Sequence, residues 1–275
     1  LMTDSALHLH TRSAASTADD APSGSLLPGE WAGLSDAGRS RTHNEDAWRI
    51  DPGIGLIVLA DGMGGYNAGE VASAIAVDSV ARALADEIFG DDTHQPHDQL
   101  ARAVHAANAA ILAAAARRPE CLGMGTTLAV AWICGSALRF SHVGDSRIYL
   151  LRAGRLYQLT RDHSVGQAMI DAGLSDPDQA RQSSMRGVLT RALGVEPTVQ
   201  PDYGEFELAG GDRLLLCSDG LTDMVADEQI VRILSRDAGS AELAQDLVDR
   251  ALAQGGFDNV TALVLKVPGL PASRK

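Results

Sequence analysis

Cysteine is scarce in this 275-residue sequence: there are three, Cys121, Cys134 and Cys217, and no two of them form a CxxC pair. An odd number of widely spaced cysteines argues against a disulfide framework and against a zinc ribbon. This use of cysteine is typical of a reducing compartment, so we expect a cytoplasmic protein.

Positive charge is also limited, because 23 Lys and Arg residues face 36 Asp and Glu residues, for a net charge of −13. Broad binding to nucleic acid or to an anionic membrane surface needs clustered Lys and Arg. We therefore expect neither nucleic acid nor membrane as a partner. A local basic pocket remains compatible with this composition.

Long apolar runs are few. Residues 121–138 carry no charge and reach the lower length limit for a membrane helix. However, they include Gly123, Gly125 and a turn signal at Cys134-Gly135-Ser136, between two β-rich runs at 126–133 and 137–143. The segment is therefore predicted to form two paired strands. The first 30 residues lack the apolar stretch of a secretory signal.

The chain divides into three parts. Residues 1–28 are rich in Ser, Thr, Ala, Asp, Gly and Pro without periodicity, which predicts a flexible tail. With 45% hydrophobic residues, residues 29–268 are expected to form a globular domain, and 269–275 a short tail. A polar, weakly periodic segment at 162–188 predicts a surface insertion with a short helix.

Strands are predicted in runs and helices in pairs. The expected strands are 56–60, 126–133, 137–143, 147–151, 203–207, 213–217 and 261–267. The expected helices are 67–89, a second from Leu100 to about Pro119, 227–236 and 240–254. This order favours an α+β fold with antiparallel sheets flanked by helices over strict βαβ alternation.

Acidic residues recur at the ends of the predicted strands. Their positions are Glu45-Asp46, Asp61-Gly62, Asp145, Asp219-Gly220 and Asp258. Strand ends bring side chains from distant segments to one rim of a sheet, where carboxylates repel each other unless cations neutralise them. Oxygen ligands suit hard cations such as Mg²⁺ or Mn²⁺.

Asp-Gly is also a frequent hairpin dipeptide, so Asp61-Gly62 and Asp219-Gly220 could each be a plain turn. Two observations favour the cation site. The acidic residues occur together, each beside an apolar segment, and Gly62-Met63-Gly64-Gly65 has more glycine than a two-residue turn requires.

Taken in order, a series of motifs resembles the bacterial type 2C metal-dependent serine/threonine protein phosphatases over roughly residues 30–267. The motifs are RTHNEDA (41–47), ADGMGG (60–65), GMGTTL (123–128), HVGDSRIYLL (142–151), LTRDHS (159–164), LTRALG (189–194), LLLCSDGLTD (214–223) and DNVTALVL (258–265). The resemblance implies a central antiparallel β-sandwich between pairs of helices, in α-β-β-α layers. It makes residues 162–188 a flap beside the active site.

The resemblance also implies a centre of two Mn²⁺ or Mg²⁺ ions, with a third ion in bacterial members. Asp61 would bridge the first two ions, the Gly62 carbonyl would bind one of them, and Asp219 and Asp258 would bind the other. Glu45 and Asp46 match the acidic pair that holds the second metal directly or through water.

Two further residues gain roles from the same resemblance. Asp145 would hold the third ion together with Asp219. Arg41 matches the arginine that binds the substrate phosphate, where a guanidinium fork suits a phosphate dianion.

The implied activity is hydrolysis of phosphoserine and phosphothreonine in proteins by direct attack of a metal-bridging hydroxide. We expect a monomer whose partners are phosphoproteins and a cognate Ser/Thr kinase. Two alternatives stay open: a catalytically dead relative that binds phosphoproteins, and a hydrolase of small phosphoesters. Retention of Asp61, Asp219 and Asp258 argues against the dead relative.

One position departs from part of the family. Some members carry a histidine directly after the Asp-Gly pair and assign it as general acid, whereas this chain has Met63. The leaving alkoxide would then take its proton from metal-bound water or another group, and His43 is the alternative donor we weigh. His142, His163 and Cys217 are expected to be structural.

Overall fold

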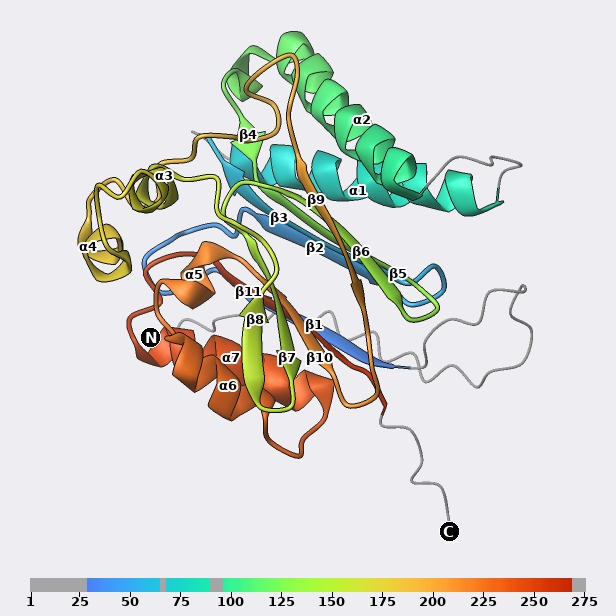
Figure 1. The fold of residues 1–275 in the computed structure, drawn as a ribbon. Helices are drawn as coiled ribbons and strands as arrows, with labels where there is room; N and C mark the ends of the chain where they lie inside the picture. The colour runs from blue at the N-terminus through green and yellow to red at the C-terminus, as the bar shows by residue number, and fades with distance from the viewer. Residues whose placement is uncertain (1–28, 65–67, 90–95, 269–275) are drawn as a thin grey trace, which may run out of the picture.

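The computed structural model describes residues 29–64, 68–89 and 96–268. Within them the chain forms four layers, with two antiparallel sheets packed face to face and helices on both outer faces (Figure 1). The predicted α+β sandwich is confirmed. The tails predicted at 1–28 and 269–275 lie outside the described residues.

The first sheet has five strands. In spatial order they are β1 (Glu30–Asp36), β11 (Val260–Lys266), β10 (Arg213–Cys217), β7 (Arg147–Arg152) and β8 (Arg155–Gln158). The second sheet follows the order β2 (Asp46–Asp51), β3 (Leu56–Met63), β5 (Leu128–Cys134), β6 (Ala137–Val143) and β9 (Asp202–Glu207). A short strand, β4 (Gly125–Thr126), pairs with the end of β3.

Two long helices, α1 (Ala68–Phe89) and α2 (Pro96–Arg117), cover the second sheet, and the single-turn helix η1 (Pro119–Cys121) follows them. The first sheet is covered by α6 (Asp227–Leu234) and α7 (Ser240–Ala253). The remaining helices are short: α3 (Val165–Asp171), α4 (Pro177–Gln182) and α5 (Asp219–Thr222).

Side-chain alternation along the strands creates three apolar layers. On β3, Leu56 and Val58 pack toward α1 and α2, whereas Ile57 and Leu59 pack between the sheets. Strands β10 and β11 divide their side chains in the same way between α6 and α7 on one face and the inter-sheet core on the other. Because both faces are buried, these strands appear in the sequence as continuous apolar runs.

The predicted strands are present, with 126–133 divided into β4 and β5. The sequence did not reveal β1, β2 or β8, and all three lie at sheet edges. Their side chains are mostly half-buried or exposed, so they lack the apolar pattern that marks a central strand.

The two Asp-Gly pairs are not hairpin turns. Asp61-Gly62 continues β3, and Asp219-Gly220 begins α5. Residues 121–138 comprise the last residue of η1, then β4, β5 and the start of β6, as the strand prediction required. Among the described residues, no helix has both the length and the apolar character that crossing a membrane requires.

The insertion contains two helices rather than the single one expected. Ser164 caps α3 by accepting from the backbone NH of Gln167, and Asp176 caps α4 through a capping box with Gln179. Both ends of the insertion are joined where the Val165 NH donates to the Val188 carbonyl at 2.8 Å.

Candidate metal centre

The acidic residues found in the sequence gather at the end of the sandwich where β2 and β3 meet β10 and β11. Asp46 at the start of β2 pairs in register with Asp61 near the end of β3. From the first sheet come Asp219, two residues after β10, and Asp258, two residues before β11. One rim therefore collects carboxylates from both sheets.

The backbone around Asp61 is fixed by two threonines. Its NH donates to Thr127 Oγ1 at 2.9 Å, and its carbonyl accepts from Thr126 Oγ1 at 2.8 Å and from the Thr127 NH at 2.9 Å. The next residue must be glycine, because a Cβ on Gly62 would lie 2.2 Å from the Gly69 carbonyl oxygen. The tight packing thus holds the Asp-Gly backbone of β3 against the start of α1.

Asp46 links the two sheets. Its Oδ2 accepts from Ser218 Oγ at 2.8 Å and from Thr261 Oγ1 at 2.6 Å, and these hydroxyls belong to the first sheet and its following loop. Its Oδ1 is buried and has no hydrogen-bond partner among the described residues. A buried carboxylate oxygen that accepts no hydrogen bond is available as a ligand for a cation.

Asp258 is held by its neighbours. Its Oδ1 accepts from the Asn259 NH at 2.8 Å, and its Oδ2 accepts from Arg41 NH2 at 2.8 Å. Asn259 in turn fixes the loop that carries Glu45. The Glu45 NH donates to Asn259 Oδ1 at 2.8 Å, and Asn259 Nδ2 donates to the Ala37 and His43 carbonyls at 3.0 and 2.9 Å.

The carboxylates raise one another's pKa values. Burial raises the pKa of Asp61 and of Asp219 well above the usual range, and neighbouring aspartates add to both shifts. Burial also raises the pKa of Asp46 to about 6, although hydrogen bonds from Thr261 and Ser218 oppose the shift. Bound divalent cations would relieve the electrostatic repulsion between these carboxylates. The atoms available to bind the cations are all oxygens, which suit hard ions.

Asp145 lies in the loop between β6 and β7 and belongs to the same cluster. Burial raises its pKa to about 7, with the charge of Asp162 adding and that of Arg147 opposing. The charge of Asp145 is the largest contribution after burial to the raised pKa of Asp219. This proximity fits the expected pairing of Asp145 with Asp219.

Glu45 and Arg41 lie at the rim. Burial raises the pKa of Glu45, whereas the charge of Arg41 and the backbone NH of Gly69 lower it. The side chain of Arg41 is 53% exposed, so it can reach a ligand in solvent. His43 is exposed and lies with Nδ1 at 2.9 Å from Thr42 Oγ1. Its role as proton donor stays a prediction.

The structure therefore brings together all the residues that the sequence nominated, and their individual roles as ligands stay predictions. It adds residues to which the sequence analysis gave no role. These are Thr126 and Thr127, which hold Asp61, Ser218 and Thr261, which hold Asp46, and Asn259, which holds the loop before Glu45. Their signal was present, because each belongs to or directly adjoins a quoted motif.

The chain matches the protein phosphatase 2C family over residues 36–254. It is 43% identical to the serine/threonine protein phosphatase PstP of Mycobacterium tuberculosis over 238 residues, which cover 86% of this chain but only 45% of that relative. It is also 35% identical to the protein phosphatase PhpP of Streptococcus pneumoniae over 85% of this chain and 96% of the relative. The chain thus spans less than half of the PstP length.

Solved structures give the same result. The crystal structure of M. tuberculosis PstP/Ppp superposes with a TM-score of 0.80 at 41% identity, covering 87% of this chain and 99% of that one. The PstP catalytic domain in complex with two manganese ions has a TM-score of 0.77 at 41% identity, with 87% and 98% coverage. By its sequence, its layers and its acidic rim, this chain belongs to the protein phosphatase 2C family.

Proposed function

We propose that this protein is a metal-dependent serine/threonine protein phosphatase. The observation that carries the proposal is the acidic rim itself. Asp46, Asp61, Asp145, Asp219 and Asp258 converge there from both sheets. The raised pKa values of Asp46, Asp61, Asp145 and Asp219, together with the unpartnered Asp46 Oδ1, support the binding of cations at this rim.

The cations are proposed to be Mn²⁺ or Mg²⁺. The oxygen-only donor set fits these hard ions, and the related PstP catalytic domain was solved with two manganese ions. Asp61, the Gly62 carbonyl, Asp219 and Asp258 would hold two ions, with Glu45 and Asp46 binding directly or through water. Asp145 and Asp219 would hold a third. When bound, the ions would activate water and neutralise charge on the phosphoryl oxygens.

The chain's own residues bind and orient the substrate around this centre. Arg41 donates to Asp258 through NH2, and a guanidinium has five N–H donors. Arg41 can therefore keep that contact while other donors bind phosphate oxygens, so that the phosphate lies beside the Asp258 carboxylate. The proposal includes direct hydrolysis by water, without a covalent phosphoenzyme.

The proposed substrates are phosphoserine and phosphothreonine proteins, and the proposed partner is a bacterial Ser/Thr kinase whose products this protein reverses. Relatives named protein phosphatases support the substrate class. The flap formed by residues 162–188, with α3 and α4, lies at the same end of the sandwich as α5 (Figure 1). This position supports the proposal that the flap contacts the protein chain around the phosphoresidue.

The test is hydrolysis of phosphothreonine peptides with Mn²⁺, with and without EDTA, beside a sugar phosphate and a nucleotide. We expect metal-dependent turnover that favours the peptides, and loss of turnover in Asp61→Asn. Preference for the small esters would indicate the alternative hydrolase. Peptide binding without turnover, unchanged by Mn²⁺, would indicate a catalytically dead binding protein.

A further inference from the structure

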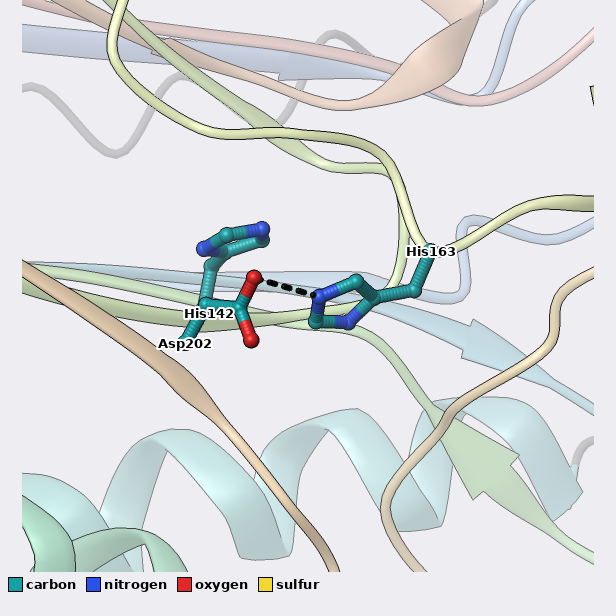
Figure 2. Close-up of side chains that lie close together, drawn as sticks. All are labelled: His142, His163 and Asp202. Carbon is teal, nitrogen blue, oxygen red and sulfur yellow. Dashed lines mark ion pairs between the residues drawn. The ribbon is translucent and has the colours of Figure 1, made fainter. Parts of the chain in front are cut away.

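A second polar cluster lies outside the metal centre, where His142 on β6, His163 before α3 and Asp202 on β9 meet (Figure 2). The two imidazole rings stack with centroids 4.6 Å apart, and both histidines are at least nine-tenths buried. His163 Nε2 lies 3.3 Å from Asp202 Oδ2. This buried histidine pair lies close to the loop between β6 and β7, which carries Asp145.

The cluster is better suited to hydrogen bonding than to holding a metal ion. Arg191 NH1 lies 2.8 Å from Asp202 Oδ1 and 3.1 Å from His163 Nε2, which places a permanent positive charge where a cation would sit. His142 Nε2 lies 2.8 Å from the Arg161 carbonyl oxygen, so this nitrogen is also engaged.

The contacts of His163 define its tautomer. Its Nδ1 accepts from the Gly144 NH at 3.2 Å, so the proton of the neutral ring must be on Nε2. That Nε2–H faces Asp202, while the two hydrogens of Arg191 NH1 have acceptors in Asp202 and the Gln200 carbonyl. Burial lowers the pKa of His163, which favours this neutral form. Asp202 thus orients the ring so that a lone pair points at Gly144.

The backbone of His163 also binds Gly144, the residue directly before Asp145. The His163 NH donates to the Gly144 carbonyl at 2.9 Å, so both polar backbone groups of Gly144 are bound by one residue. Gly144 has φ +98°, and a Cβ there would lie 2.6 Å from Thr127 Cγ2. The two hydrogen bonds with His163 therefore fix a positive-φ backbone conformation at the residue directly before Asp145.

We propose that His163, oriented by Asp202, is a positioning residue that holds Gly144 so that Asp145 faces Asp219. Because Asp145 is the carboxylate assigned to the third cation, His163 controls the affinity of that site and leaves the other two unchanged. Since the Thr190 NH also donates to the His163 carbonyl at 2.8 Å, the same residue joins this site to the end of the flap. This inference rests on the proposed function.

The experiment is calorimetric Mn²⁺ titration of the metal-free protein without substrate, combined with kcat and KM for a phosphothreonine peptide. We expect His163→Leu to weaken the lowest-affinity Mn²⁺ site about three- to tenfold, which corresponds to one lost hydrogen bond. The tighter sites and KM should stay unchanged while kcat at limiting Mn²⁺ falls. His163→Asn should restore wild-type behaviour, because its amide oxygen can accept from Gly144.

Two controls separate positioning from general stability. His142→Leu removes the stacked ring without touching Gly144, so it should lower stability and leave the weak Mn²⁺ site intact. Adding His163→Leu to Asp145→Asn should cause no further loss at that site, because coupled residues are not additive. If His163→Leu does not fold, Asp202→Asn on the partly exposed β9 position tests the same orientation and should weaken the same site.

The inference is overturned if folded His163→Leu or Asp202→Asn binds Mn²⁺ as the wild type does, or if His163→Asn is as impaired as His163→Leu. Failure of the proposed function would look different, because the wild type itself would then bind no Mn²⁺ or hydrolyse no phosphopeptide.

Discussion

Replacing Asp145 by Asn should stabilise the metal-free protein at alkaline pH, although it removes a residue assigned to the metal centre. Asp145 is 9% exposed and its pKa is raised to about 7 by burial and by the charge of Asp162. An aspartate in an unfolded chain has a pKa of about 3.9. The folded protein therefore binds more protons than the unfolded protein between about pH 4 and pH 7.

In that window the free energy of unfolding falls as the pH rises, because the folded carboxyl must give up its proton in an unfavourable site. Each pH unit costs about 1.4 kcal/mol, so about three units give about 4 kcal/mol at pH 8 relative to pH 4. The amide introduced by Asp145→Asn does not titrate in this range. The advantage of Asp145→Asn over the wild type should therefore be larger at pH 8 than at pH 4.

Urea unfolding in EDTA at pH 4, 6 and 8 measures the effect, with Asp249→Asn on α7 as the control. Asp249 is exposed and, within the part of the chain that the structure describes, accepts a hydrogen bond only from Gln245 Nε2 in the same helix, at 3.0 Å. Saturating Mn²⁺ should reverse the order at pH 8, because the ion stabilises the wild type more than the variant. An equal effect of Asp145→Asn at pH 4 and pH 8 would refute the reasoning.

Three more predictions follow from the site, the flap and the core. Arg41→Ala should raise KM for phosphopeptides about ten- to a hundredfold through loss of a charge-assisted contact. Calorimetric Mn²⁺ affinity should stay near wild type, and an unchanged KM with weakened metal binding would place Arg41 in support of Asp258 instead. Met169→Ala or Leu174→Ala in the flap should change kcat/KM among phosphopeptides more than for p-nitrophenyl phosphate, and parallel losses on both would contradict a specificity role. Leu263→Ala, in the core between the sheets, should lower the free energy of unfolding by about 2–5 kcal/mol in urea, and a loss below about 1 kcal/mol would contradict its packing.

The central strands and the long helices could be predicted from the sequence because their pattern is local. Strands β3, β10 and β11 are buried on both faces, and α1 and α7 repeat apolar residues at helical spacing. The edge strands β1, β2 and β8 could not, since their half-exposed side chains carry little apolar signal. The two helices of the insertion were likewise hidden by short length and polar composition.

The sequence by itself identified residues that the structure brings together at the acidic rim, because Asp61, Asp145, Asp219 and Asp258 each adjoin an apolar strand in motifs of the family, and their roles as metal ligands stay predictions. Only the tertiary structure decided how they are held. Asp46 is fixed by hydroxyls from the opposite sheet, Asn259 binds a loop more than 200 positions away in the chain, and His163 holds the glycine before Asp145. Such contacts depend on how the two sheets pack and which side chains meet at their rim, and no local spacing encodes them.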